Sequence, residues 1–313
     1  MTTTVVAAID VGGTSMKGAL CTRAGDLSGL EQRDTRGFDR RSDLIAAIVG
    51  FAVDLTARGR AAGGTVVAVG LAVPGVVDAV RGIGISSMIL GWREVPFVHL
   101  LTQRTGLPVG FGHDVQVAAH AEGQRGAARG CQHYLYLSLG TGVGSAMIFD
   151  GRIYLGTTGL GGEMAHFMVE PEGPPCRCGK FGCLEMVASA DAVSRRYAEL
   201  HPGGGSFSAH DVLTRMQGGD AAARGVWTRA VTALSRAIAA YVEILEPEVV
   251  VVGGGMSAAG SPLFDPLSAL MRTGVSRPDP APVVPAGLGP LAGLHGAALR
   301  AWEQIDVREV SRD

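Results

Sequence analysis

Three cysteines and one histidine are grouped near the middle of this 313-residue chain. Cys176, Cys178 and Cys183 lie within eight residues, and His166 precedes the first of them by ten. Thiolate sulfur and imidazole nitrogen are the ligands of closed tetrahedral Zn²⁺ sites. Because four protein ligands leave no coordination position for water, we expect a structural Zn²⁺. The alternative is that the cysteines merely pack, or form one disulfide and leave a spare thiol.

Three apolar, strand-like runs end in loops that contain glycine. Glycine lets backbone N–H groups approach phosphate oxygens closely, because no Cβ stands in the way. The first loop adds a carboxylate that could hold Mg²⁺, a hydroxyl and an ammonium group. One such loop alone could be only a tight turn, but three in this order indicate a nucleotide site. The loops are Asp10-Val-Gly12-Gly13-Thr14-Ser-Met-Lys17, Gly140-Thr141-Gly142-Val-Gly144 and Gly253-Gly254-Gly255.

One further carboxylate, Asp114, follows an apolar stretch at residues 107–111 and stands where we expect a helix to begin. Aspartate is favoured at this position as a helix N-cap, and the local sequence alone favours that interpretation. A kinase nevertheless needs a carboxylate that orients the acceptor hydroxyl and accepts its proton. Asp114 is therefore also a candidate catalytic base.

The elements that must position these residues alternate between strands and helices. A strand, a glycine turn and a return strand open the chain, and the same pattern returns near residue 134. This loose repetition predicts an α/β fold duplicated into two lobes, with a mixed sheet in each. We expect strands at 4–9, 16–21, 66–75, 134–139, 145–149 and 248–252, and helices at 42–58, about 95–105, 115–128, 186–200 and 221–246.

Composition excludes several classes of protein. Hydrophobic residues make up 47% of the chain and charged residues 18%, so it is not a disordered chain. The formal net charge of −2 gives no basic footprint for nucleic acid. We find no signal peptide and no apolar run long enough to span a membrane. We therefore expect a cytoplasmic protein with small-molecule ligands.

Taken together, these segments resemble the ROK family of sugar kinases and related repressors, within the group of actin-like ATPase (duplicated ribonuclease H-like) folds. The most specific part is Gly161-Gly162-Glu163-Met-Ala-His166, joined to the Cys-x-Cys-Gly-x-x-Gly-Cys-x-Glu run that ends at Glu185. Its order and spacing agree with bacterial glucokinases of this family. No helix-turn-helix segment precedes Asp10 in this sequence, which favours the kinase branch over the repressors.

The resemblance implies roles for individual residues. Asp114 corresponds to the base that accepts the proton of the sugar 6-hydroxyl during attack on ATP. The sugar would be held by residues from several segments. The implied sugar contacts are Gly75, His113, Glu163, His166 and Glu185. The implied contacts to ATP and Mg²⁺ are Asp10, Gly12, Gly13, Thr14, Lys17, Gly140, Thr141, Gly142, Gly144, Gly254 and Gly255. His166 would serve both the sugar and the Zn²⁺ that it binds with Cys176, Cys178 and Cys183.

The resemblance also implies an organisation. We expect a small N-terminal α/β lobe at residues 1–120, joined by a C-terminal helix at about 293–305. A large α/β lobe at 121–292 would carry the zinc knuckle and the sugar and nucleotide site. Similar proteins are often homodimers or homotetramers, so we expect a homo-oligomer.

Two departures from the glucokinase pattern leave the sugar open. The family has Asn-Asp where this chain has His113-Asp114, and Ser-Pro-Asn where it has Ser86-Ser-Met88. An amide is lost at both positions, and in the family both lie near the middle hydroxyls of the sugar. A glucokinase with neutral changes is one interpretation. A kinase for an amino sugar such as kanosamine or N-acetylmannosamine is the other.

Two readings from other classes also stay open. A sugar-binding regulator without catalysis would keep the pocket, but Asp114 argues against it. A zinc hydrolase could use the histidine and cysteines, but four protein ligands would leave no site for water.

Overall fold

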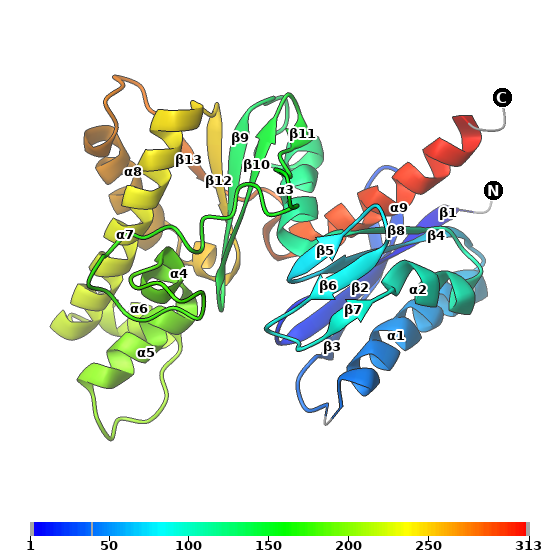
Figure 1. Ribbon diagram of the computed structural model, residues 1–313, viewed down its shortest axis with the longest axis horizontal. Helices are drawn as coiled ribbons and strands as arrows, with labels where there is room; N and C mark the ends of the chain where they lie inside the picture. Colours follow the sequence, from blue (N-terminus) through cyan, green and yellow to red (C-terminus); the bar gives the residue numbers. More distant parts are fainter. Residues whose placement is uncertain (1–2, 39, 311–313) are drawn as a thin grey trace. The chain divides into compact units, whose positions relative to one another are not determined.

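The computed structural model describes residues 3–38 and 40–310 of the chain. These residues form two compact units, each with its own five-stranded sheet (Figure 1). Unit 1 comprises Met1–Ala121, Thr157–Leu160 and Leu291–Asp313, and unit 2 comprises Glu122–Gly156 and Gly161–Pro290. Among the described residues, no helix is both long enough and apolar enough to cross a bilayer.

Unit 1 is built on a mixed sheet with strand order β3-β2-β1-β4-β8. β1 pairs antiparallel with β2 and parallel with β4, and β8 extends the parallel part. A separate small sheet has the order β5-β6-β7. The elements are β1 (Thr4–Val11), β2 (Ser15–Thr22), β3 (Leu27–Asp34), α1 (Arg41–Ala61), β4 (Thr65–Val73), β5 (Val76–Asp78), β6 (Ile83–Ser86), β7 (Arg93–Val95), α2 (Phe97–Thr105), β8 (Val109–His113), α3 (Asp114–Arg125) and α9 (Ala292–Val310).

The β1 strand is apolar from Val5 to Ile9 because helices cover both faces of its sheet. Val5, Ala7 and Ile9 belong to the core that includes the buried face of α1. The alternate residues Val6 and Ala8 belong to the core under α9. This division follows from the two-residue period of a strand.

Small residues let α9 lie unusually close to the unit 1 sheet. A Cβ on Gly70 would stand 1.9 Å from the carbonyl oxygen of Ala297, and one on Gly110 would stand 2.0 Å from that of Arg300. The core on this face is correspondingly rich in alanine. The C-terminal helix is thereby fixed in the unit that begins with the N-terminus.

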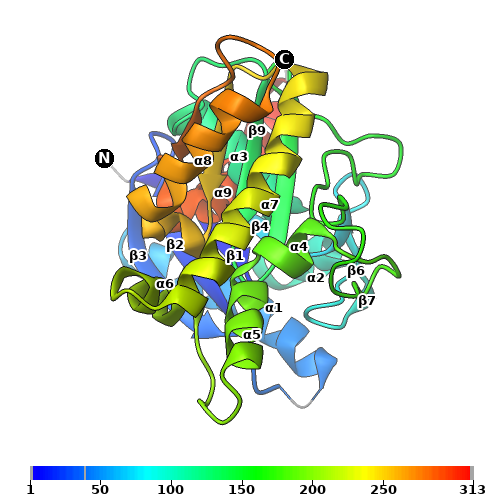
Figure 2. The ribbon, with the colours of Figure 1, turned by 90° about the vertical axis from the view of Figure 1, so that its left-hand side faces the viewer.

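Unit 2 repeats the topology with strand order β11-β10-β9-β12-β13. Here too a strand pairs antiparallel with its sequence neighbour and parallel with a later strand. Five α-helices belong to this unit, and the longest, α7, lies beside α8 (Figure 2). Many residues of α7 belong to the core of the unit. The elements are β9 (Tyr134–Leu139), β10 (Val143–Phe149), β11 (Arg152–Ile153), α4 (Leu184–Ala188), α5 (Ala190–Leu200), α6 (Ala209–Gln217), α7 (Ala221–Leu245), β12 (Val249–Gly253), η1 (Gly255–Ala259), α8 (Ser261–Gly274), β13 (Val283–Pro285) and η2 (Gly289–Leu291).

The repeated strand order confirms the predicted α/β fold with a mixed sheet in each of two units. The division falls inside α3, beside the boundary that we expected at residue 120. Residues 157–160 cluster with unit 1, where Gln116 donates from Nε2 to the Gly159 carbonyl at 3.1 Å. That the two units act as independent lobes stays a prediction.

Candidate active site

The four predicted metal ligands of unit 2 come together. One ligand atom from each of His166, Cys176, Cys178 and Cys183 lies within 4.8 Å of the others. His166 Nδ1 lies 3.5 Å from Cys176 Sγ, and Cys178 Sγ lies 3.6 Å from Cys183 Sγ. Bond lengths of about 2.1 Å to nitrogen and 2.3 Å to sulfur give tetrahedral edges of about 3.6–3.8 Å. The cluster therefore fits Zn²⁺ held by four protein ligands.

A tight backbone turn wraps the cysteines around this centre. Met168 bridges to Cys183 and Pro175 bridges to Phe181, which folds the segment back on itself. Gly182 has φ +59°, and a Cβ there would stand 1.5 Å from the carbonyl oxygen of Glu170. No other residue type fits at this position, so the glycine is required by the fold of the knuckle.

The knuckle is anchored to α7 by an ion pair. The Arg229 guanidinium donates from Nε to Glu170 Oε1 at 3.0 Å and from Nη2 to Oε2 at 2.5 Å. The hydrogen bonds from Arg229 lower the pKa of Glu170, although partial burial opposes this. Such a two-point contact fixes orientation as well as distance.

Glu163, His166 and Glu185 are brought together by short backbone contacts. The buried Ser145 hydroxyl of β10 donates to the Gly162 carbonyl at 2.6 Å and accepts from the Met164 N–H at 2.7 Å. Glu163 Oε1 accepts from the Ala165 N–H at 2.9 Å, and the Glu185 N–H donates to the Ala165 carbonyl at 3.0 Å. Two distant segments of the chain, one with Glu163 and one with Glu185, thus meet at Ala165, the residue before His166.

The second and third glycine loops of the sequence meet in unit 2. The Gly140–Gly144 loop is the turn between β9 and β10, and Gly254 follows β12. Gly254 has φ +81°, and a Cβ there would stand 2.4 Å from the Leu139 carbonyl oxygen. Because β9 and β12 are parallel neighbours, their carboxyl ends carry these loops to the same sheet edge.

Unit 1 places the first glycine loop around Asp10. Lys17 lies opposite Asp10 in the β1–β2 pair, and Gly12 donates its N–H to the Ser15 carbonyl at 2.9 Å. Gly293, in the first turn of α9, leaves room for the carboxylate: a Cβ there would stand 2.5 Å from Asp10 Oδ2. The pKa of Asp10 is raised to about 7, first by burial and second by the charge of Asp114, whereas Lys17 lowers it.

Asp114 is the first residue of α3 and follows directly after β8. Its Oδ1 accepts from the Val115 N–H at 2.8 Å, and Oδ1 also lies 3.4 Å from His113 Nε2. The other ring nitrogen, His113 Nδ1, is buried without a hydrogen-bond partner among the described residues. The carboxylate is thus held through one oxygen. The imidazole turns one nitrogen to Asp114 and the other into the protein.

The remaining predicted sugar residue of unit 1, Gly75, lies against the Ser86–Ser87 backbone. It has φ +108°, and a Cβ there would stand 2.2 Å from the Ser86 carbonyl oxygen. The following turn leaves Met88 and Ile89 largely exposed, at 73% and 62%. A Cβ on Gly13 would stand 2.8 Å from Ile89, so this turn packs against the first glycine loop.

The predicted residues therefore form two groups, one in each unit. Unit 1 gathers the Asp10–Lys17 loop with His113 and Asp114, and unit 2 gathers the remaining loops with Glu163, Glu185 and the metal cluster. Sequence reasoning missed two supporting residues, Ser145 and Gly293. An isolated serine in a strand and a glycine in a helix gave no signal of their contacts.

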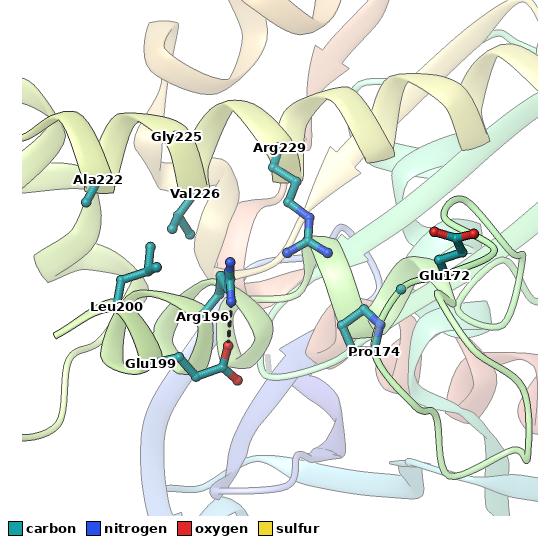
Figure 3. A pocket seen from close by; sticks show the side chains of 10 residues that line it. Glu172, Pro174, Arg196, Glu199, Leu200, Ala222, Gly225, Val226 and Arg229 are labelled. Atoms are coloured by element: carbon teal, nitrogen blue, oxygen red, sulfur yellow. Dashed lines mark hydrogen bonds and ion pairs between the residues drawn. The ribbon is translucent and has the colours of Figure 1, made fainter. Parts of the chain in front are cut away.

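A separate groove in unit 2 contains none of the predicted site residues. It has a volume of about 620 Å³ and lies between α5, α7 and the loop that leads into the knuckle (Figure 3). Its lining includes Arg196, Glu199 and Arg229, whose charged groups are paired.

Known proteins match the chain along most of its length. The ROK family model matches residues 6–304. A glucokinase from Thermotoga maritima is 35% identical over 272 residues, which cover 83% of this chain and 84% of that protein. A kanosamine kinase from Amycolatopsis mediterranei is 31% identical over 307 residues, or 94% of each chain.

A solved structure gives the same result. A ROK family glucokinase from Streptomyces griseus, in complex with glucose and AMPPNP, superimposes with a TM-score of 0.83 at 27% identity. The match covers 96% of this chain and 99% of that one. Fold and sequence agree over nearly the whole length, and the chain belongs to the ROK family.

Proposed function

We propose that this protein is an ATP-dependent sugar kinase that phosphorylates the 6-hydroxyl of a hexose. The observation that carries the proposal is the placement of Asp114 in unit 1. β1, β4 and β8 run parallel, so Asp10 and Asp114 leave their strands at the same edge of the sheet. The charge of Asp114 is close enough to raise the pKa of Asp10. A base and a phosphate-binding loop are thus neighbours, as phosphoryl transfer needs.

In the proposed reaction, different side chains accept the proton, bind the phosphates and bind Mg²⁺. With Oδ1 held by the Val115 N–H, Asp114 accepts the hydroxyl proton as the sugar oxygen attacks the γ-phosphorus. Lys17 and the N–H groups of the glycine loops bind the phosphates. Asp10 offers a carboxylate oxygen to Mg²⁺, which when bound offsets the negative charge of the phosphates.

Zn²⁺ has an organising role in this proposal. His166 turns Nδ1 to the cysteine cluster, which leaves Nε2 for a sugar hydroxyl. A ligated imidazole has a fixed tautomer and orientation, so the metal would set the geometry of a sugar contact without taking part in the chemistry. Glu163 and Glu185 would accept hydrogen bonds from the neighbouring hydroxyls.

The test is a comparison of ADP release with Mg-ATP and a panel of sugars. The panel holds glucose, mannose, glucosamine, kanosamine, N-acetylglucosamine and N-acetylmannosamine. We expect strong turnover on at least one sugar and a loss of about 10²–10⁴-fold in kcat for Asp114→Asn. If a folded, zinc-loaded protein releases no ADP with any sugar of the panel, the proposal is overturned in favour of a sugar-binding protein without catalysis.

An amino sugar is the second candidate substrate, and His113 favours it. An imidazole replaces the amide that the glucokinase pattern has beside the base, and Met88 replaces another. The 31% identity to a kanosamine kinase supports the same idea. The candidate fails if glucose exceeds every amino sugar in kcat/KM by a wide margin.

A further inference from the structure

Glu185 contacts the phosphate-binding turn as well as the sugar-binding segment. Its Oε2 accepts from the Val143 N–H at 3.2 Å, at the end of the Gly140–Gly144 loop. Its own N–H donates to the Ala165 carbonyl, between Glu163 and His166. Glu185 therefore lies where the Gly140–Gly144 loop meets the segment from Glu163 to His166.

The missing side chain of Gly142 makes room for this contact. A Cβ at this position would stand 2.6 Å from Glu185 Oε2 and 3.5 Å from its carboxyl carbon. The φ of Gly142 is not in the left-handed region, so backbone conformation does not require glycine there. The neighbour that excludes a side chain is the carboxylate itself.

The carboxylate thus uses an anion-binding group of the loop. A backbone N–H at such a turn is a donor that a nucleotide phosphate would use. A carboxylate that accepts from the same N–H competes with the phosphate for it. The negative charges of the carboxylate and the phosphate would also repel each other. We propose that Glu185 withholds the loop from the nucleotide until a bound sugar takes the carboxylate. This inference rests on the proposed function and adds a coupling between its two substrates.

This coupling selects sugar over water as the acceptor. Without sugar, the loop binds ATP weakly and little ATP is hydrolysed. A sugar hydroxyl that hydrogen-bonds to Glu185 draws the carboxylate from the Val143 N–H and frees it for phosphate. Because linkage is reciprocal, the nucleotide must then tighten sugar binding by the same factor.

The test measures AMPPNP binding by calorimetry, with Mg²⁺ and without sugar. Glu185→Ala removes the carboxylate, and Glu185→Gln keeps an acceptor but removes the charge. Glu172→Gln, an exposed carboxylate of the knuckle, serves as the matched control. We expect about tenfold tighter AMPPNP binding in Glu185→Ala, a smaller gain in Glu185→Gln, and none in the control. Sugar-free ATP hydrolysis should rise in the same order.

A second measurement adds the preferred sugar of the panel. In the wild type it should tighten AMPPNP binding about tenfold, in Glu185→Gln the factor should be smaller, and in Glu185→Ala it should approach one. Equal sugar-free affinities in wild type and both Glu185 variants would overturn the inference. Because that comparison uses no sugar and no turnover, it stands even if no sugar in the panel is phosphorylated, a result that would instead contradict the proposed function.

Discussion

At the scale of single residues, the ionised carboxylate of Asp10 lowers the stability of the folded protein, although the proposed function uses that charge. The carboxylate is held at the start of α9 and near Asp114, and its pKa is raised to about 7. A raised pKa means that the folded state resists the charged form, which is the form that the proposed function needs for Mg²⁺. The proposed function explains this cost, because in it the cation would arrive with the nucleotide.

Asp10→Asn should therefore stabilise the nucleotide-free protein while impairing turnover. Between pH 4 and 7 the unfolded state loses the Asp10 proton and the folded state keeps it, so the wild type loses stability as pH rises. The variant should gain about 4 kcal/mol in unfolding free energy at pH 8 and little at pH 4. Urea unfolding at both pH values measures this. A variant that is less stable at pH 8 would contradict the pKa shift.

His113 and Met88 carry the prediction on specificity. His113→Asn combined with Met88→Asn restores both amides of the glucokinase pattern. If the imidazole and thioether select the sugar, the ratio of kcat/KM for glucose to that for the best amino sugar should rise at least about tenfold. Steady-state kinetics of the double variant and the wild type check the ratio. No change in it would assign both residues to neutral variation.

At the scale of elements, we expect the knuckle to depend on a bound metal. Metal analysis of the purified protein should find one Zn²⁺ per chain. Cys183→Ser should lose it and melt at a lower temperature, because binding energy at a structural zinc site contributes to folding. Cys131→Ser, outside the cluster, is the control and should keep the metal. A wild-type protein without bound metal and with an unchanged melting temperature in Cys183→Ser would contradict the zinc assignment.

The strength of the sequence signal decided which elements could be predicted. The β1–β2 and β9–β10 hairpins combine apolar strands with glycine turns, and both were predicted. β3 was not predicted, because an edge strand with the sequence LSGLEQRD is largely exposed and has no apolar alternation. The helix expected at 186–200 is broken at Ser189, whose hydroxyl caps α5 by accepting from the Ala192 N–H. A serine inside an apolar pattern did not reveal that break.

In the candidate site too, some features could be predicted from the sequence and others could not. The metal cluster was predictable because ligand types and spacing identify it. The contact between Glu185 and Val143 was not predictable, since it joins side chain and backbone across 42 residues. The roles of the individual sugar and nucleotide residues stay predictions.

At the scale of the whole molecule, the C-terminal helix packs in the unit that contains the N-terminal strands. α9 comes from the C-terminal part of the sequence and packs on β1, β4 and β8 of unit 1. The two units share one strand order, so duplication explains both sheets. Unit 1 is complete only when its last helix docks, which makes the glycines under α9 important for stability.

Gly110→Ala tests this packing. Its Cβ would overlap the Arg300 backbone, which cannot yield as a flexible side chain would. We expect a loss of about 3 kcal/mol in unfolding free energy. Gly225→Ala in α7 is the matched control: its Cβ meets nothing within 4 Å, and helix propensity should add about 0.5–1 kcal/mol. Equal stability of the two variants would contradict the close packing of α9.

Identification of the phosphorylated product tests the central claim most directly. The wild type and Asp114→Asn would be incubated with Mg-ATP and the best sugar of the panel, and the product examined by phosphorus–proton correlation NMR. We predict one sugar phosphate, coupled to the protons at carbon 6, in equal amount to the ADP formed, and almost none with the variant. ADP without a sugar phosphate, phosphate on another carbon, or an undiminished rate in Asp114→Asn would contradict the account.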